Sequence, residues 1–141
     1  AGNASTRLFV IVTDPRLMKM IRAVSPASTQ RSHMSPSPAA ILICSDPSIA
    51  RNTSEIRQDF LTAFDAGAAA ENMALTSIEL GLGVCFIKSF YEKAIKRILN
   101  LPDRILVSIL ISVGYPKNIK LRKQVTKRSE PVFLNQYVDQ Q

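Results

Sequence analysis

The sequence is poor in the residues that bind transition metals and form disulfides. It holds two cysteines and one histidine in 141 residues. Because there is no close cysteine pair and no second histidine, we expect no zinc site. Cys44 and Cys85 each lie inside an apolar run, where a buried free thiol is the first expectation; a disulfide would require two strand interiors to face each other. So few cysteines favour a reducing compartment, and we predict a cytoplasmic protein.

Long apolar runs are also missing. No stretch approaches the ~20 uncharged apolar residues that a membrane-spanning helix needs, so we expect no membrane partner. The longest apolar run, residues 105–113, is interrupted by two serines and predicts a buried strand. The first residues show no basic region followed by an apolar stretch, so no secretory signal is expected. The length favours a single domain over residues 1–141.

Self-contained catalytic motifs are absent from the sequence. His33 stands in a Ser/Pro-rich segment, and no serine shows the pattern of a nucleophile elbow. The Gly81-Leu82-Gly83 run follows a predicted helix instead of opening one, which argues against a dinucleotide loop. There is no Walker-type phosphate loop. If the chain is an enzyme, we therefore expect a cofactor to carry the reaction.

Acidic residues are missing from one basic segment near the C-terminal end. The formal net charge is +7, which is compatible with nucleic acid, anionic lipid or a phosphorylated small molecule as partner. This segment also lacks the aromatic residues that would stack on bases, so we do not expect a nucleic-acid partner. Its basic residues are Lys117, Lys120, Arg122, Lys123, Lys127 and Arg128.

The first half of the sequence predicts two strands and a helix. Residues 8–13 are β-branched and apolar, which indicates a buried strand. Asp14 is placed as the N-cap and Pro15 as the first residue of a helix that runs to about Val24. Residues 25–38 are rich in Ser and Pro and predict an irregular loop. Residues 39–44 predict the second strand, and the polar residues 48–59 are expected to be partly helical.

The second half predicts two helices and two strands. A helix is expected from Asp65, as N-cap, to Leu80, with Gly81 as its left-handed cap. The small residues in its first half would let another helix or a flat ring approach the backbone. A strand over residues 84–87, a helix capped by Ser89, and a strand over residues 105–113 follow, and residues 131–134 indicate a strand or arm. Strands and helices in this order predict α/β or α+β layering, with helices covering a sheet.

Three blocks of the sequence resemble the nitroreductase family, in the family's order. Residues 65–90 resemble its central helix and following strand, with an Asp, a small-residue helix, an Asn and a Gly-Leu-Gly run. Leu101-Pro102, residues 105–113 and Gly114-Tyr115-Pro116 are similar to a later strand and its turn. Residues 1–15 resemble the flavin-contacting loop and first core strand. The resemblance implies an α+β fold with a nitroreductase-like sheet flanked by helices.

The resemblance also implies a function and a set of cofactor contacts. Family members bind FMN at a homodimer interface and pass two electrons from NADH or NADPH to a small acceptor such as a nitroaromatic or a quinone. By position, Asn3 would contact the flavin ring, and Ser5 stands where the family often has glutamine. The strand end would turn its backbone toward the flavin, where N–H groups stabilise negative charge on the reduced ring. That strand end comprises Phe86, Ile87, Lys88 and Ser89, of which the first two side chains are equally well explained as core.

For the flavin phosphate, the resemblance implies Lys127 and Arg128, with Arg122 and Lys123 as further candidates. A solvated basic tail is the alternative for these residues. Family members also carry an N-terminal amphipathic helix with an arginine-rich motif that holds the same phosphate, and the resemblance here begins after that helix. Each missing charge-assisted contact would cost roughly 1.5–3 kcal/mol of binding free energy. A family relative with a structural or binding role and little or no flavin therefore stays open as the second hypothesis.

Overall fold

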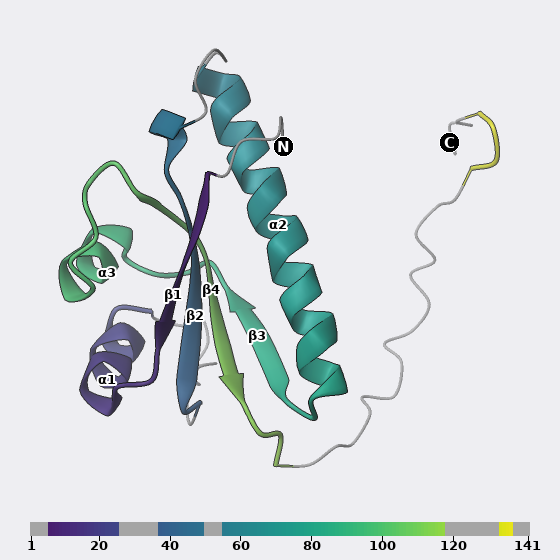
Figure 1. Ribbon diagram of the computed structural model, residues 1–141. Coiled ribbons are helices and arrows are strands. Elements are labelled where there is room, and N and C mark those ends of the chain that lie inside the picture. Colours follow the sequence, from purple (N-terminus) through teal and green to yellow (C-terminus); the bar gives the residue numbers. More distant parts are fainter. Residues whose placement is uncertain (1–5, 26–36, 50–54, 118–132, 137–141) are drawn as a thin grey trace, which may run out of the picture.

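The computed structural model describes residues 6–25, 37–49, 55–117 and 133–136; of residues 55–59 it describes the backbone alone. These residues form one four-stranded sheet in the order β1-β2-β4-β3, with every neighbouring pair antiparallel (Figure 1). The strands are β1 (Arg7–Val12), β2 (Ala39–Ser45), β3 (Gly83–Ile87) and β4 (Leu106–Gly114). The prediction of an α+β fold is confirmed, because helices and an antiparallel sheet form separate layers.

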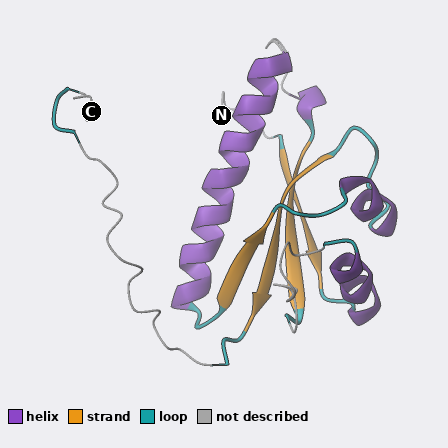
Figure 2. Ribbon diagram, turned by 180° about the vertical axis from the view of Figure 1, so that it is seen from behind, coloured by secondary structure: helices purple, strands orange, loops and turns teal. Residues whose placement is uncertain are grey.

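One long helix covers one face of the sheet and two short helices cover the other (Figures 1 and 2). Helix α2 (Glu55–Glu79) packs on the first face against residues such as Ile43 and Ile111. Helices α1 (Pro15–Ala23) and α3 (Glu92–Ile98) close the second face, with Met18, Ile21 and Ile95 fully buried. The molecule therefore has two cores, one on each side of a single sheet. None of the described helices combines the length and apolar character that crossing a bilayer requires.

Helix α1 begins as the sequence predicts. The Asp14 carboxylate accepts hydrogen bonds from the backbone N–H groups of Arg16 at 2.8 Å and Leu17 at 3.0 Å. Pro15 follows at the first helical position, where a missing N–H has no cost. The polar cap satisfies donors that would otherwise lack a partner, and this fixes where the chain leaves β1.

Helix α2 starts ten residues earlier than the sequence prediction. Asp65 is not its N-cap but a buried residue in its middle, with 7% of its surface exposed. Residues 55–64 contain neither glycine nor proline, so nothing stops the helix from extending toward the N-terminus. A polar side chain caps a helix only where the preceding residue leaves helical geometry. The prediction that Asp65 caps the helix is therefore wrong.

The C-terminal end of α2 agrees with the prediction. Gly81 adopts a left-handed backbone with φ of +72°. The Leu82 N–H donates to the Ser77 carbonyl at 2.8 Å, and the Gly81 N–H donates to the Ile78 carbonyl at 3.0 Å. This pair of bonds is the Schellman arrangement, which satisfies helix-end carbonyls and turns the chain directly into β3.

Two further predictions need correction. Ser89 does not cap α3, since Tyr91 holds the N-cap position and its side chain makes no capping bond. The Tyr91 N–H donates instead to the Val24 carbonyl at 2.9 Å, so this turn is bonded to the end of α1. The helix then begins at Glu92. Residues 131–134 were predicted as a strand or an arm; of these, the described residues 133 and 134 are not in a strand, and Leu134 is 87% exposed.

The two cysteines are free thiols in different environments. Cys44 is fully buried in the core beneath α1 and α3, and Cys85 in β3 is half-buried. Burial away from water raises the pKa of the Cys44 thiol to about 11, with the nearby Glu92 carboxylate as a smaller cause. Cys44 therefore behaves as a small apolar side chain at neutral pH, as the sequence suggested.

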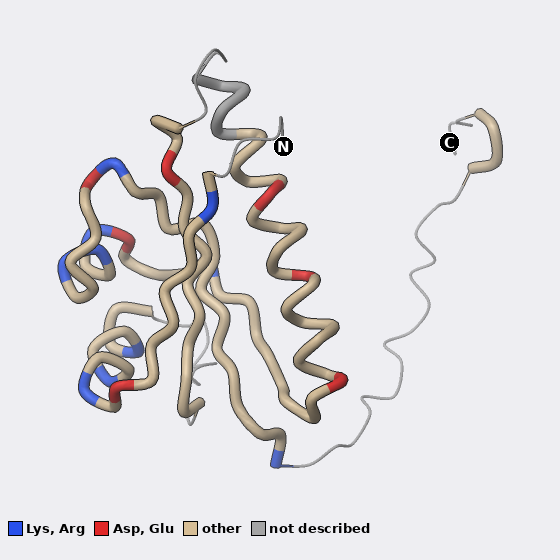
Figure 3. The backbone as a smooth tube through the Cα atoms, in the orientation of Figure 1, with Lys and Arg blue, Asp and Glu red and all other residues tan. Residues whose placement is uncertain are grey.

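The two helical layers differ in the sign of their charged side chains (Figure 3). Helices α1 and α3 carry most of the described Lys and Arg residues, whereas residues 60–87 contain acidic residues and no Lys or Arg. Among the residues whose side chains the structure describes, α2 carries no Lys or Arg. On the side of the sheet that it covers, Arg7 and Lys88 each line a pocket.

Candidate functional site

The predicted cofactor strand runs toward the edge of the sheet where the chain enters the fold. In the strand register Arg7 lies opposite Ser45, and Ser45 lies opposite Leu106, so β1 begins where β2 ends and β4 begins. Strand β3 runs antiparallel to β4 toward this edge and stops four residues short of it, because Ile87 lies opposite Leu110 and β4 begins at Leu106. The Asp46 N–H donates to the Thr6 carbonyl at 2.8 Å and anchors the N-terminal entry beside this edge.

A pocket of about 480 Å³ opens at this edge, between α2 and the start of β4. We call it the Lys88 pocket. Its volume lies within the range of roughly 300–1,000 Å³ typical of small-molecule sites. Most of its walls are apolar. Thr62 and Ser108 add hydroxyl groups, and Lys88 and Glu92 add one positive and one negative charge. The lining residues are Thr62, Ala63, Ala66, Lys88, Glu92, Leu106, Val107, Ser108 and Ile109.

Lys88 is held at this pocket by two contacts. Its Nζ donates to the Val107 carbonyl oxygen at 3.3 Å. The same ammonium lies 5.1 Å from the centre of the Phe90 ring, a distance at which a cation is attracted to an aromatic face. These contacts keep a positive charge beside the pocket, while the exposed residue stays accessible to a ligand.

Glu92 supports this arrangement through the N–H group of Val107. Its Oε1 accepts a hydrogen bond from the Val107 N–H at 3.0 Å and forms an ion pair with the Lys96 ammonium at 3.2 Å. Burial opposes ionisation of Glu92, but the hydrogen bonds from Val107 and Lys96, with the charges of Lys96 and Lys88, hold its pKa below the usual value. Glu92 is thus an anion that fixes the first residues of β4 and so the carbonyl that Lys88 contacts.

Asp46 is a second charged group at this edge that the sequence did not single out. It accepts hydrogen bonds from the Ser48 hydroxyl and backbone, and it pairs with Arg104 at 3.1 Å. The Ser48 hydroxyl and then Arg104 lower the pKa of the Asp46 carboxyl against a smaller opposing effect of burial. Its only sequence signal was the Ser-Asp-Pro-Ser run that ends the second strand.

The structure brings four of the predicted cofactor residues together at the end of β3. Ile87 is 6% exposed and belongs to the core, so its side chain is not available to a ligand. Phe86 is 47% exposed and points out of that core, and Lys88 and Ser89 are exposed. The other predicted contacts lie outside the described residues; they are Asn3, Ser5, Arg122, Lys123, Lys127 and Arg128.

Several alanines of α2 face the sheet, and three of them also line pockets. Ala66, Ala69 and Ala70 are buried and pack against Ile43 and Ile111 of the sheet. Their small size lets the helix backbone approach the strands closely. Because Ala63 and Ala66 also line the Lys88 pocket, a flat ring against these small side chains stays a prediction.

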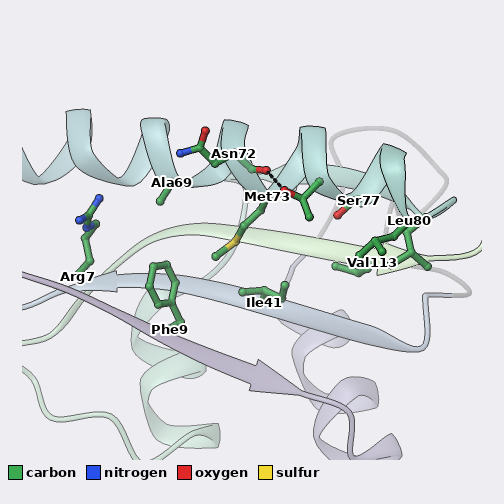
Figure 4. A pocket seen from close by; sticks show the side chains of 11 residues that line it. Arg7, Phe9, Ile41, Ala69, Asn72, Met73, Ser77, Leu80 and Val113 are labelled. Atoms are coloured by element: carbon green, nitrogen blue, oxygen red, sulfur yellow. Dashed lines mark hydrogen bonds between the residues drawn. The ribbon is translucent and has the colours of Figure 1, made fainter.

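A second pocket, of about 640 Å³, lies on the same face of the sheet beside the C-terminal half of α2 (Figure 4). We call it the Met73 pocket. The sequence gave no sign of it, because its walls come from a helix, three strands and the α2–β3 turn. It shares no lining residue with the Lys88 pocket. The lining residues are Arg7, Phe9, Ile41, Ala69, Asn72, Met73, Thr76, Ser77, Leu80, Leu82 and Val113.

Comparison with known proteins identifies the family. A sequence model of the nitroreductase family matches residues 25–115, which is more than half of the chain. The chain belongs to the nitroreductase family. The resemblance first noted in residues 65–90 and 101–116 is confirmed, since the match covers the first block and the second as far as residue 115.

The relatives of this nitroreductase-family chain agree in fold and in general activity. A protein of Archaeoglobus fulgidus, named as a candidate NADH dehydrogenase/NAD(P)H nitroreductase, is 29% identical over 135 residues, covering 93% of this chain and 73% of the relative. A nitroreductase-family structure from Clostridium novyi NT is 28% identical with a TM-score of 0.71, covering 82% of this chain and 65% of that one. An FMN-dependent nitroreductase from Clostridium difficile R20291 is 25% identical with a TM-score of 0.67, covering 94% and 76%. The predicted class, an NAD(P)H-dependent oxidoreductase, agrees with these names.

Proposed function

We propose that this nitroreductase-family chain binds FMN and transfers two electrons from NADH or NADPH to a small acceptor such as a nitroaromatic or a quinone. The observation that carries the proposal is the Lys88 pocket, which lies where the predicted cofactor strand ends. The names of the Archaeoglobus and Clostridium difficile relatives support NAD(P)H as the reductant and FMN as the cofactor. The two free thiols are compatible with a cytoplasmic site of action, which we propose with it.

The residues around the Lys88 pocket fit a flat ring with polar edges. Ala63, Leu106 and Ile109 give it apolar walls, and Thr62 and Ser108 add hydroxyl groups. A pocket with mostly apolar walls and a few placed polar groups is what a planar heterocycle requires. Lys88 supplies a cation beside it, at the strand end where the family resemblance places the flavin.

When bound, FMN supplies the reversible uptake of a hydride and the release of two electrons. The protein's part is to bind, orient and stabilise charge. The Lys88 ammonium, fixed by Val107 and Phe90, would favour negative charge on the reduced ring. The exposed main chain at Lys88 and Ser89 would offer backbone N–H groups at the same place. Among the described residues no cluster of cations accompanies Lys88, so we propose that Lys127 and Arg128 hold the phosphate.

We also propose that the protein works as a homodimer in which α2 forms the interface. One side of α2 packs on the sheet, yet its opposite side carries a stripe of large apolar residues that are 57–70% exposed. A helix that is apolar on both sides is stable in water when both sides are covered. A second copy would cover this surface with an identical stripe. The residues of the α2 stripe are Phe60, Phe64, Leu75 and Ile78.

The decisive experiment is a titration of the purified chain with FMN, followed by absorbance and by quenching of flavin fluorescence. We expect a yellow complex near one flavin per chain that oxidises NADH or NADPH in the presence of a quinone. Lys88→Met should weaken FMN binding by about tenfold or more, because a hydrogen bond or ion pair to a charged group contributes roughly that much. Lys93→Met is the matched control, since Lys93 is exposed on α3 and does not line the Lys88 pocket.

A protein that stays colourless after incubation with excess FMN would contradict the proposal. That result would instead support the second hypothesis, a family relative with a binding role and no flavin. If Lys88→Met and Lys93→Met both bound FMN with the affinity of the original chain, the cofactor would bind away from the Lys88 pocket.

A further inference from the structure

The Met73 pocket combines a single cation with a long apolar cavity. Among the described residues that line it, Arg7 alone carries a charge. Figure 4 shows Arg7 at one end of the pocket, and Leu80 and Val113 at the other. Between these ends, Met73 points from α2 toward the sheet, on the side where Phe9 and Ile41 lie. The pocket is therefore polarised along its length.

The cation at the polar end is free to bind a ligand. Among the described residues no carboxylate lies within ion-pair distance of Arg7, whose side chain is exposed. The Asn72 amide lies toward the same end and adds a hydrogen-bond donor (Figure 4). A planar guanidinium pairs with a carboxylate through two parallel hydrogen bonds, so this end favours an anion with that geometry.

The middle of the pocket favours an aromatic body over an aliphatic one. Phe9 is 47% exposed, which leaves much of its ring available for contact. The Met73 thioether is flexible and polarizable, and sulfur makes favourable contacts with aromatic rings. A flat ring between Phe9 and Met73 would gain both a ring–ring and a sulfur–ring contact. The volume of about 640 Å³ is sufficient for a bicyclic ligand.

We propose that the Met73 pocket binds an aromatic monocarboxylate, with the carboxylate on Arg7 and Asn72 and the ring between Phe9 and Met73. The apolar side chains Leu80 and Val113 cover the far end of the ring system. The proposal is independent of flavin binding, because this pocket and the Lys88 pocket have no lining residue in common.

The test uses the full chain, without FMN, labelled with ¹³C at the methionine methyl groups. The sequence has four methionines, so four methyl signals report on separate places. Titration with 2-naphthylacetate should move the Met73 signal and leave the Met18 signal in place, because Met18 is buried on the opposite side of the sheet. The uncharged 2-naphthylacetamide has the same ring and should bind about tenfold more weakly or worse.

Two substitutions separate the charge from the cavity. Arg7→Gln should weaken binding of the acid by about tenfold while leaving binding of the amide nearly unchanged. Arg16→Gln on α1 is the matched control, since it removes an equally exposed cation from the other layer and should have no effect. Lys88→Met should also have no effect, which would exclude binding at the Lys88 pocket.

Three results would overturn the proposal. The first is equal affinity for acid and amide, which would show that Arg7 does not select an anion. The second is a Met73 signal that naphthylacetate does not move. The third is a Met73 signal that shifts with protein concentration in the absence of ligand, since a second copy of the chain would then be the occupant.

Discussion

The Lys88 ammonium donates a hydrogen bond to the Val107 carbonyl oxygen at 3.3 Å, and this bond joins the end of β3 to the start of β4. The two residues are neighbours only because β3 and β4 pair at the edge of the sheet, although 18 residues separate them in the sequence. The Val107 N–H donates in turn to Glu92, so the main chain of one residue contacts both an anion and a cation. The position of the Lys88 ammonium at the candidate flavin site thus depends on the backbone at the start of β4.

The Glu92 carboxylate should stabilise the fold at neutral pH and lose this effect in acid. Its folded-state pKa is lowered, so its contribution is present above the ordinary glutamate pKa and is lost as the pH falls through the folded value. Glu92→Gln should cost roughly 0.5–1 kcal/mol of unfolding free energy at pH 7, a modest figure because the side chain is 37% exposed and water screens the charge. Urea unfolding at pH 7 and at pH 3 measures the difference, which should shrink at the lower pH.

The control for this prediction is Glu79→Gln, which removes an exposed carboxylate at the end of α2. It should change stability by no more than a few tenths of a kcal/mol. If Glu92→Gln and Glu79→Gln behaved alike at both pH values, the contacts of Glu92 with Val107 and Lys96 would have no energetic role.

The two exposed glycines of the α2 region should respond in opposite directions to the same substitution. Gly81→Ala should destabilise the fold by about 1–2 kcal/mol, because alanine in a left-handed conformation has that cost. Gly67→Ala should stabilise it by about 0.5–1 kcal/mol, since alanine favours the helix interior and a methyl group there meets open space. Thermal unfolding of both variants at one protein concentration checks this. A Gly81→Ala variant as stable as the original chain would contradict the left-handed cap.

Local signals in the sequence predicted the parts of the fold that neighbouring residues decide. Asp14-Pro15 at the start of α1 and Gly81 at the end of α2 were correct, because a cap is a contact within one turn. Asp65 and Ser89 carry similar side chains but do not cap, since chain segments outside those turns decide whether the helix stops there. The order of strands and helices was also correct, because it follows from apolar periodicity.

The candidate sites depend on pairings that no local pattern encodes. Lys88 was predicted as a cofactor contact by resemblance, but its contact with Val107 follows from the pairing of β3 with β4. The pairing of β2 with β4 includes an irregularity after Ile43, where Ser108 has no directly opposite residue in the register. The Met73 pocket was not predicted at all, since it lies between one helix and strands from both halves of the chain.

The α2 stripe should control the oligomeric state. Ile78→Asp places a charge on a side chain that is 70% exposed, so the isolated fold should tolerate it while a stripe-to-stripe interface should not. We expect sedimentation velocity to show a dimer for the original chain and a monomer for the variant. Met20→Asp is the control, because Met20 is 49% exposed on α1 at the opposite face of the sheet and should leave the dimer intact. An original chain that is monomeric at all concentrations would contradict the proposed interface.

The two thiols should differ in reactivity in the native protein. Cys44 is fully buried and its pKa is about 11, so at pH 8 it is protonated and shielded from reagents. A disulfide reagent should therefore modify about one thiol per native chain, at half-buried Cys85, and both thiols in denaturant. In Cys85→Ser, reaction should fall to the rate at which the protein opens. Rapid reaction of native Cys85→Ser would show that the core beneath α1 and α3 is open to solvent.

The raised pKa of Cys44 also predicts how stability changes in alkali. The folded protein keeps the thiol proton to about pH 11, whereas the unfolded chain releases it near the ordinary value of 9.0. Stability from the neutral thiol is therefore fully present below pH 9 and is lost as the pH rises toward 11, by on the order of 2 kcal/mol. In Cys44→Ala this alkaline loss should disappear, while Cys85→Ser should retain it. Urea unfolding between pH 8 and pH 11 compares the three proteins, and parallel profiles for all of them would show that Cys44 does not ionise in that range on unfolding.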